Sequence, residues 1–120
     1  MAGIFKAYDV RGVYPDELDE DKMRRIGNAY LQFLGGAGKS VVVGRDGRLH
    51  SASLKDALVE GLLDGGARVI DIGLCTTPMS YFAIGHLNAD GGLMVTASHN
   101  PPQYNGLKVS RAQAFPCSYE

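Results

Sequence analysis

Hydrophobic and polar positions along the chain follow two alternating patterns. Over residues 22–34 apolar side chains recur at spacings of three and four, which predicts one buried face of a helix. Asp19 can cap the start of this helix, and the pair Gly35 and Gly36 can end it. A continuous β-branched run follows at 40–44 and predicts a strand that is covered on both faces.

The same alternation continues through the rest of the chain. The predicted elements are a helix capped by Ser51 or Ser53 and ended by Gly65 and Gly66, a strand at 68–73, a short helix capped by Thr77, and strands at 91–97 and 107–110. Met79 and Phe82 of the short helix are expected in the core. Residues 4–9 are interpreted as an extended segment, after which Arg11 and Gly12 turn the chain.

Strands that alternate with helices favour an α/β fold. Such connections give parallel strands joined by right-handed crossovers, with helices on both faces of the sheet. At 120 residues the chain has the length of one domain, so a single domain is predicted over 1–120. We expect a three-layer α/β/α arrangement.

Composition excludes several classes of partner. The chain has 12 Lys and Arg against 13 Asp and Glu, so no global field attracts nucleic acid or an anionic membrane. It has no apolar run of membrane-spanning length and no cationic segment leading into an apolar stretch, as a secretory signal would have. Cys75 and Cys117 are far apart, which argues against a disulfide framework or zinc site and favours a reducing cytoplasm.

The candidate chemistry centres on residues 96–101, with the sequence TASHNP, directly after the predicted strand at 91–97. Ser98 would lie at the end of the sheet, in a loop stiffened by two prolines. A hydrolase nucleophile normally has glycines two positions to either side, which Ser98 lacks. Adjacent residues of an extended chain point to opposite sides, so His99 is poorly placed to accept the Ser98 proton. The alternative is a polar turn without chemistry.

Four segments together resemble a known family. The stretch 96–101 resembles the active-serine signature of the α-D-phosphohexomutases, the phosphomannomutase and phosphoglucomutase family. The stretches 5–12 (FKAYDVRG), 44–48 (GRDGR) and 105–108 (NGLK) resemble its phosphate-handling segment, its conserved turn and its active-site lysine segment, in the family's order.

The resemblance implies specific roles. The catalytic residues it implies are Ser98 as a phosphoserine, His99, Lys108 and Arg11, and the phosphate contacts are Tyr8, Arg11, Asn100 and Lys108. Without the resemblance, an arginine or lysine here is an ordinary surface charge, and His99 is a turn residue. Asp46 in the 44–48 turn can either brace the loop by pairing with an arginine or belong to a phosphate contact, and bracing is favoured.

The resemblance also implies a fold order. The four predicted strands would form a mixed, mostly parallel sheet of order 2-1-3-4, numbered along the chain, with the last strand antiparallel. A crevice opens where such an order reverses, beyond the carboxyl ends of the strands at 40–44 and 91–97. Arg45 and Ser98 follow those two ends.

The implied reaction is an isomerisation of hexose phosphates. Phosphate would move between C1 and C6 through phosphoserine and a bisphosphorylated sugar, with Mg²⁺ bound to the Ser98 phosphate and hexose 1,6-bisphosphate as activator. The family's metal carboxylates and sugar-binding domains have no match here, since the acidic run at 16–21 is better explained as a helix start. We therefore expect a domain I fragment, truncated before its last helix and inactive alone. The alternative is a standalone phosphate-binding or interaction domain.

Overall fold

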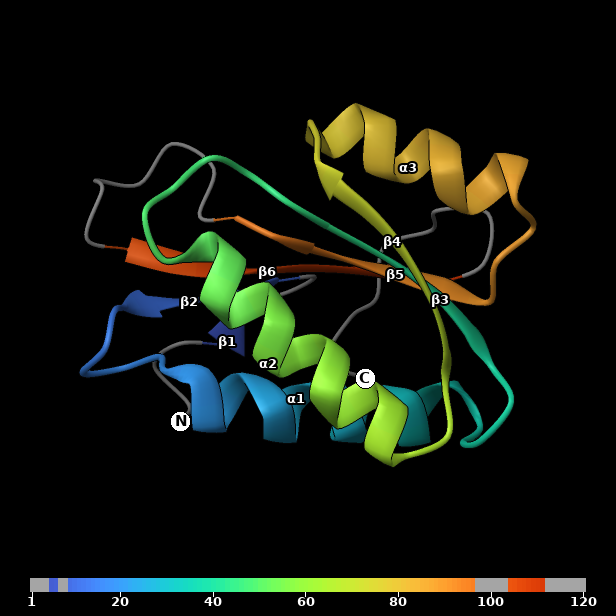
Figure 1. Ribbon diagram of the computed structural model, residues 1–120, viewed down its shortest axis with the longest axis horizontal. Coiled ribbons are helices and arrows are strands. Elements are labelled where there is room, and N and C mark those ends of the chain that lie inside the picture. Colours follow the sequence, from blue (N-terminus) through green and yellow to red (C-terminus); the bar gives the residue numbers. More distant parts are fainter. Residues whose placement is uncertain (1–4, 7–8, 97–103, 112–120) are drawn as a thin grey trace.

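The computed structural model describes residues 5–6, 9–96 and 104–111 (Figure 1). In chain order the elements are β1 (Phe5–Lys6), β2 (Asp9–Val13), α1 (Glu20–Leu34), β3 (Ser40–Arg45), α2 (Ser51–Asp64), β4 (Arg68–Leu74), α3 (Thr77–His86), β5 (Gly91–Val95) and β6 (Tyr104–Arg111). The predicted alternation of helices and strands is confirmed from α1 to β5.

One sheet contains all the described strands, in the order β1-β2-β6-β5-β3-β4. Strand β3 pairs in parallel with β4 and β5, whereas β5–β6, β6–β2 and β2–β1 are antiparallel. The predicted count of four strands is wrong, because β1 and β2 extend the sheet beyond β6. The complete order therefore differs from the predicted one, although the four predicted strands are neighbours in the sequence β4-β3-β5-β6. Among those four strands, the prediction of mostly parallel pairing with an antiparallel last strand is confirmed, whereas the described sheet as a whole is not mostly parallel because β1–β2 and β2–β6 are antiparallel.

The segment around Arg11 and Gly12 is a strand and not the predicted turn. Both residues belong to β2, where Arg11 lies opposite Gly106 and Gly12 lies opposite Asn105 of β6. This pairing joins residues almost a whole chain length apart, so local sequence pattern does not reveal it.

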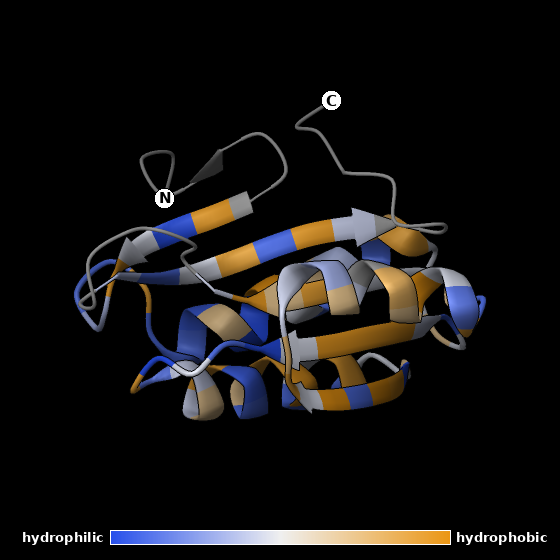
Figure 2. Ribbon diagram, turned by 90° about the horizontal axis from the view of Figure 1, so that it is seen from above, coloured by the Kyte–Doolittle hydropathy of each residue, from blue (hydrophilic) through white to orange (hydrophobic). Residues whose placement is uncertain are grey.

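The helices cover both faces of the sheet, as expected for three layers (Figure 1). Helices α1 and α2 pack on one face, where Val41 and Val43 of β3 join the larger hydrophobic core. Helix α3 lies on the other face, where Val42 packs with Ile84 and Ala89. Successive strand residues point to opposite faces, so a strand between two helical layers must be apolar throughout. In Figure 2 the strands alternate in colour toward the β2–β6 side and are more uniformly hydrophobic at the centre.

Local signals explain the first helix and its packing. Asp19 accepts a hydrogen bond from the Lys22 amide at 2.9 Å, and Gly35 ends α1 with φ of 121°, so both predicted ends are confirmed. Helices α1 and α2 approach closely because glycines lie at their crossing. A Cβ at Gly27 would lie 2.7 Å from the carbonyl oxygen of Leu58. The two helices thereby form one closely packed layer on this face of the sheet.

Two predicted helix caps are wrong. Helix α2 follows His50 without a side-chain cap, and Ser51, its first residue, donates its hydroxyl hydrogen to Asp46 instead. Helix α3 is capped by Thr76, which accepts from the Met79 amide at 3.3 Å, so the cap lies one residue before Thr77. In both cases several adjacent hydroxyl residues compete, and tertiary contacts decide which one caps.

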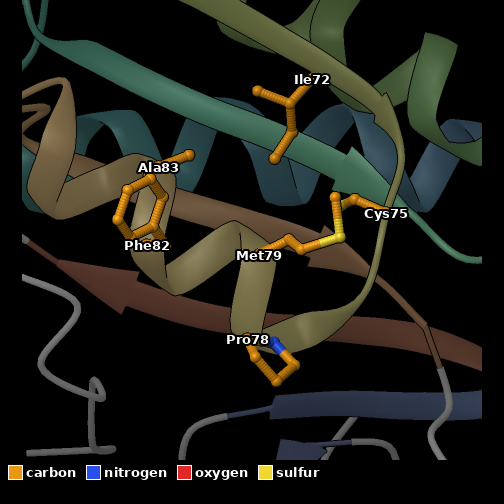
Figure 3. Close-up of a pocket in the computed structure, with 6 residues that line it drawn as sticks. All are labelled: Ile72, Cys75, Pro78, Met79, Phe82 and Ala83. Atoms are coloured by element: carbon orange, nitrogen blue, oxygen red, sulfur yellow. The ribbon is translucent and has the colours of Figure 1, made fainter.

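The outward side of α3 is apolar, contrary to the expectation that Met79 and Phe82 belong to the core. Their side chains are 55% and 69% exposed. They line an open pocket of about 400 Å³ between α3 and the end of β4, which Figure 3 shows with Ile72, Cys75 and Ala83. The periodicity identified an apolar helix correctly, but the described residues place no further layer over it.

Candidate active site

The site edge is formed by the carboxyl ends of β3 and β5. Arg45 and Val95 are paired at the end of the parallel ladder, and the Asp46 amide donates to the Val95 carbonyl at 3.0 Å. Thr96 continues from β5 and donates its amide hydrogen to Gly106 of β6 at 3.0 Å. The predicted proximity of the two strand ends is confirmed.

Several predicted site residues lie outside the described residues. They are Tyr8, Ser98, His99 and Asn100. The structure describes Arg11, Lys108 and the residues on either side of 97–103. Roles assigned to the four residues therefore stay predictions.

Arg11 and Lys108 are brought to one face of the sheet by the strand register. Val10 is paired with Leu107, which is paired in turn with Val95, and all three join the core beneath α1 and α2. Because neighbouring residues in a strand point to opposite faces, Arg11 and Lys108 project to the other face. Arg11 lies opposite Gly106, so the two cationic residues are diagonal neighbours across β2 and β6. The sequence suggested both residues but not this shared position.

Gly106 allows β2 and β6 to come together at this point. A Cβ on Gly106 would lie 3.0 Å from the Cα of Arg11 and closer still to the carbonyl oxygen of Val10. No side chain fits without moving the backbone of β2. The glycine of the NGLK segment thus sets the spacing between the strands that carry Arg11 and Lys108.

Asp46 is the centre of a polar network at the end of β3. Its carboxylate accepts from the Ser51 hydroxyl at 2.5 Å and from the Arg48 amide and Nε at 3.1 and 3.2 Å. Burial by itself would raise the pKa of Asp46, but hydrogen bonds from Ser51, Thr96 and Arg48 outweigh it and hold the pKa below its ordinary value. The carboxylate is therefore ionised at neutral pH.

The network also reaches the start of β6. Arg48 donates through Nη1 to the Tyr104 carbonyl at 3.3 Å, and Asn105 donates through Nδ2 to the Ser51 hydroxyl at 3.0 Å. Ser51 and Asn105 are 0% and 2% exposed. The bracing interpretation of Asp46 is confirmed. Sequence reasoning missed Ser51 and Asn105 as its partners, because neither spacing nor residue type distinguishes a buried network from helix caps and turns.

The described residues do not form a metal site. Among them, no group of three or more His, Cys, Asp or Glu side chains is arranged to hold an ion. The carboxylate of Asp46 at the site edge is already bound by Ser51 and Arg48.

No helix in the described part of the chain is long and apolar enough to cross a bilayer.

These features define an α/β domain whose polar residues gather beyond the carboxyl ends of neighbouring parallel strands, the usual place for a ligand site in such sheets. The family described as phosphoglucomutase/phosphomannomutase, alpha/beta/alpha domain I, matches residues 2–120. The chain therefore belongs to the phosphoglucomutase/phosphomannomutase family and corresponds to its domain I.

Individual relatives agree with this assignment. A phosphomannomutase of Escherichia coli is 57% identical over 114 residues, covering 95% of this chain and 25% of the relative. A phosphomannomutase of Klebsiella pneumoniae is 56% identical and is covered to 71%. The crystal structure of a phosphoglucomutase/phosphomannomutase family protein from Burkholderia thailandensis superposes with a TM-score of 0.82 at 44% identity, covering 91% of this chain and 26% of that one. The chain thus spans about a quarter of the length of several of its relatives.

Proposed function

We propose that this chain is the serine-bearing catalytic domain of a phosphohexomutase, an isomerase that moves phosphate between C1 and C6 of a hexose. One observation carries the proposal beyond family membership. Arg11 of β2 and Lys108 of β6 share a face of the sheet, and Lys108 is paired with Met94 of β5, the strand that leads into the segment containing Ser98. Phosphoryl transfer depends on alignment and on neutralising charge, and Lys108 next to β5 with Arg11 one strand further away would supply positive charge for the neutralisation.

The proposed reaction has two transfers that balance. In the first, the Oγ–P bond of phosphorylated Ser98 breaks as the C6 hydroxyl oxygen of a hexose 1-phosphate attacks phosphorus, and the hydroxyl proton leaves to a base. The Ser98 Oγ takes up a proton as it leaves. In the second, the Ser98 hydroxyl oxygen attacks the C1 phosphate of the resulting 1,6-bisphosphate, the hydroxyl proton leaves to a base, and the bond between phosphorus and the C1 oxygen breaks. Hexose 6-phosphate leaves after its C1 oxygen takes up a proton, and phosphoserine is restored. Any released bisphosphate would serve as the activator that phosphorylates the resting serine.

Each proposed site residue has a task in these transfers. Arg11 offers a fork of donors that matches phosphate oxygens, and Lys108 places a point charge on the transferring group. Tyr8 and Asn100 would contact phosphate. His99 would orient the phosphate or exchange the hydroxyl proton, since imidazole titrates near neutral pH.

Other parts of the machinery would come from outside this chain. Mg²⁺ would bind the Ser98 phosphate together with carboxylates of a further domain, where it would neutralise phosphate charge. Contacts to the sugar would lie in the remaining domains of a full-length enzyme, working in the cytoplasm. The chain alone is therefore expected to accept phosphate slowly at best and to show no sustained turnover.

Two assays test the proposal. The chain is incubated with glucose 1,6-bisphosphate, and intact mass with peptide mapping locates any phosphate, with Ser98→Ala as the control. We expect one phosphate on Ser98, whereas phosphate on Ser51 or Ser110 alone would contradict the assignment.

The second assay measures turnover in a hybrid in which this chain replaces the aligned 114 residues of the Escherichia coli relative. Conversion of glucose 1-phosphate or mannose 1-phosphate to the 6-phosphate should depend on Ser98. A hybrid that binds sugar phosphate but neither forms phosphoserine nor turns over would favour a phosphate-binding module.

A further inference from the structure

We propose that Asp46 is a positioning residue for the segment 97–103: with Ser51, Arg48 and Asn105 it ties together the two ends of that segment. The inference rests on the proposed function in one respect, namely that Ser98 within the segment is the phosphoryl acceptor. It adds a role for the GRDGR turn that family membership alone does not supply.

The first end of the segment is held at Thr96. The Asp46 amide donates to Val95, the residue before Thr96, at 3.0 Å. The Thr96 side chain also hydrogen-bonds to the Asp46 carboxylate, and only 6% of Thr96 is exposed. Asp46, the residue after β3, therefore binds Val95 through its backbone amide and Thr96 through its carboxylate.

The second end is held through Arg48 and Ser51. Arg48 pairs with the Asp46 carboxylate at 3.2 Å and donates to the Tyr104 carbonyl at 3.3 Å. Ser51 donates to Asp46 at 2.5 Å and accepts from Asn105 at 3.0 Å. Two separate routes thus run from one carboxylate to the first residues of β6.

The arrangement suits positioning more than direct catalysis. Asp46 has its oxygens engaged by Ser51, Arg48 and Thr96, which leaves it little capacity to accept a proton from a substrate. Members of a buried polar network are coupled, because removing one leaves the others unpaired in a medium of low dielectric constant. The network holds Thr96 and Tyr104, the described residues that flank Ser98 in sequence, and transfer rates are sensitive to displacements of about 1 Å.

The test compares Asp46→Asn with Asp71→Asn in the 120-residue chain. Asp71 is also a carboxylate in an ion pair, with Lys55 at 2.6 Å, but it lies on β4 away from the segment. For Asp46→Asn we expect phosphate loading of Ser98 from glucose 1,6-bisphosphate to slow by about tenfold, the factor for one hydrogen bond to a charged group. Hydrogen exchange should rise in peptides that cover 93–107 and stay unchanged in α1. Asp71→Asn should change neither.

Arg48→Lys separates positioning from simple charge, and it also serves if Asp46→Asn does not fold. Lysine keeps the positive charge but lacks the fork that reaches Asp46 and Tyr104 together. Positioning predicts slower loading and faster local exchange in Arg48→Lys, whereas a general electrostatic role predicts neither. Loading within twofold of the parent chain and unchanged exchange in both variants would overturn the proposal. If the parent chain takes no phosphate, loading is compared in the hybrid enzyme, where a lack of phosphoserine would contradict the proposed function, and exchange in 93–107 still decides the positioning role.

Discussion

Substituting Gly106 by alanine should separate β2 from β6 and test how the two cations are brought together. The added Cβ would lie 3.0 Å from the Arg11 Cα and closer to the Val10 carbonyl oxygen, so backbone and not a flexible side chain must move. Relieving the contact requires a displacement of β2 on the order of 1 Å. Overpacking of this kind costs about 1–3 kcal/mol. For a domain of this size that lowers the Tm by about 4–12 °C.

Gly85→Ala is the matched control. Gly85 lies in α3, and a Cβ added there would meet nothing within 4 Å, so alanine should be neutral or should stabilise by up to about 1 kcal/mol. Thermal unfolding followed by circular dichroism compares the two variants under identical conditions. Equal Tm values for Gly106→Ala and Gly85→Ala would refute the packing explanation.

The same pair of variants links packing to activity. In the hybrid enzyme, assayed well below the Tm, Gly106→Ala should reduce kcat by tenfold to about a hundredfold, because Arg11 is displaced relative to Lys108. Gly85→Ala should leave kcat unchanged. A destabilised Gly106→Ala variant with normal kcat would show that the spacing of β2 and β6 matters for stability but not for transfer.

Three further predictions concern charge and surface. In the hybrid, Lys108→Ala and Arg11→Ala should each lower kcat by orders of magnitude with little change in Tm, and near-normal kcat would reduce either residue to a surface charge. The pKa of Asp46 is lowered in the folded state, so the ionised carboxylate stabilises the fold above its unfolded pKa of about 4, and this stabilisation is lost as pH falls through the folded pKa. The urea midpoint, measured from pH 7 to 3, should therefore fall more in the parent chain than in Asp46→Asn. The apolar outer side of α3 should promote self-association, which Phe82→Gln should weaken in size-exclusion chromatography with light scattering; equal masses at all concentrations would contradict this.

The sequence was sufficient where local signals agree with tertiary structure. Asp19 and Gly35 bound α1 as predicted, since a cap and a left-handed glycine act within one turn of the chain. The apolar run in β3 identified a strand covered on both faces, because each face meets a separate core. The ends of α1 depend on residues that are near in sequence. The apolar run of β3 is the pattern that any strand buried on both faces requires.

Nonlocal contacts explain what the sequence did not predict. Strand β2 contains Arg11 and Gly12 and has no strand-like alternation strong enough to stand alone, so only pairing with β6 makes it a strand. Ser51 suited a helix cap, yet the partly buried carboxylate of Asp46 competes for its hydroxyl. Phe82 is apolar at helical spacing, but periodicity gives a helix face without saying what covers it.

The position of β6 between β5 and β2 affects the order in which the domain can form during synthesis. Arg11 is synthesised long before its cross-strand partner Gly106, which belongs to the last of the described strands. Closing so long a chain segment is entropically costly and slows folding of topologies rich in such contacts. The helices and parallel strands can assemble first, whereas β2 cannot pair with β6 until β6 has been made. Arg11 and Lys108 therefore reach one face only when β6, the last of the described strands, joins the sheet, so the two cations come together late in the assembly of this domain.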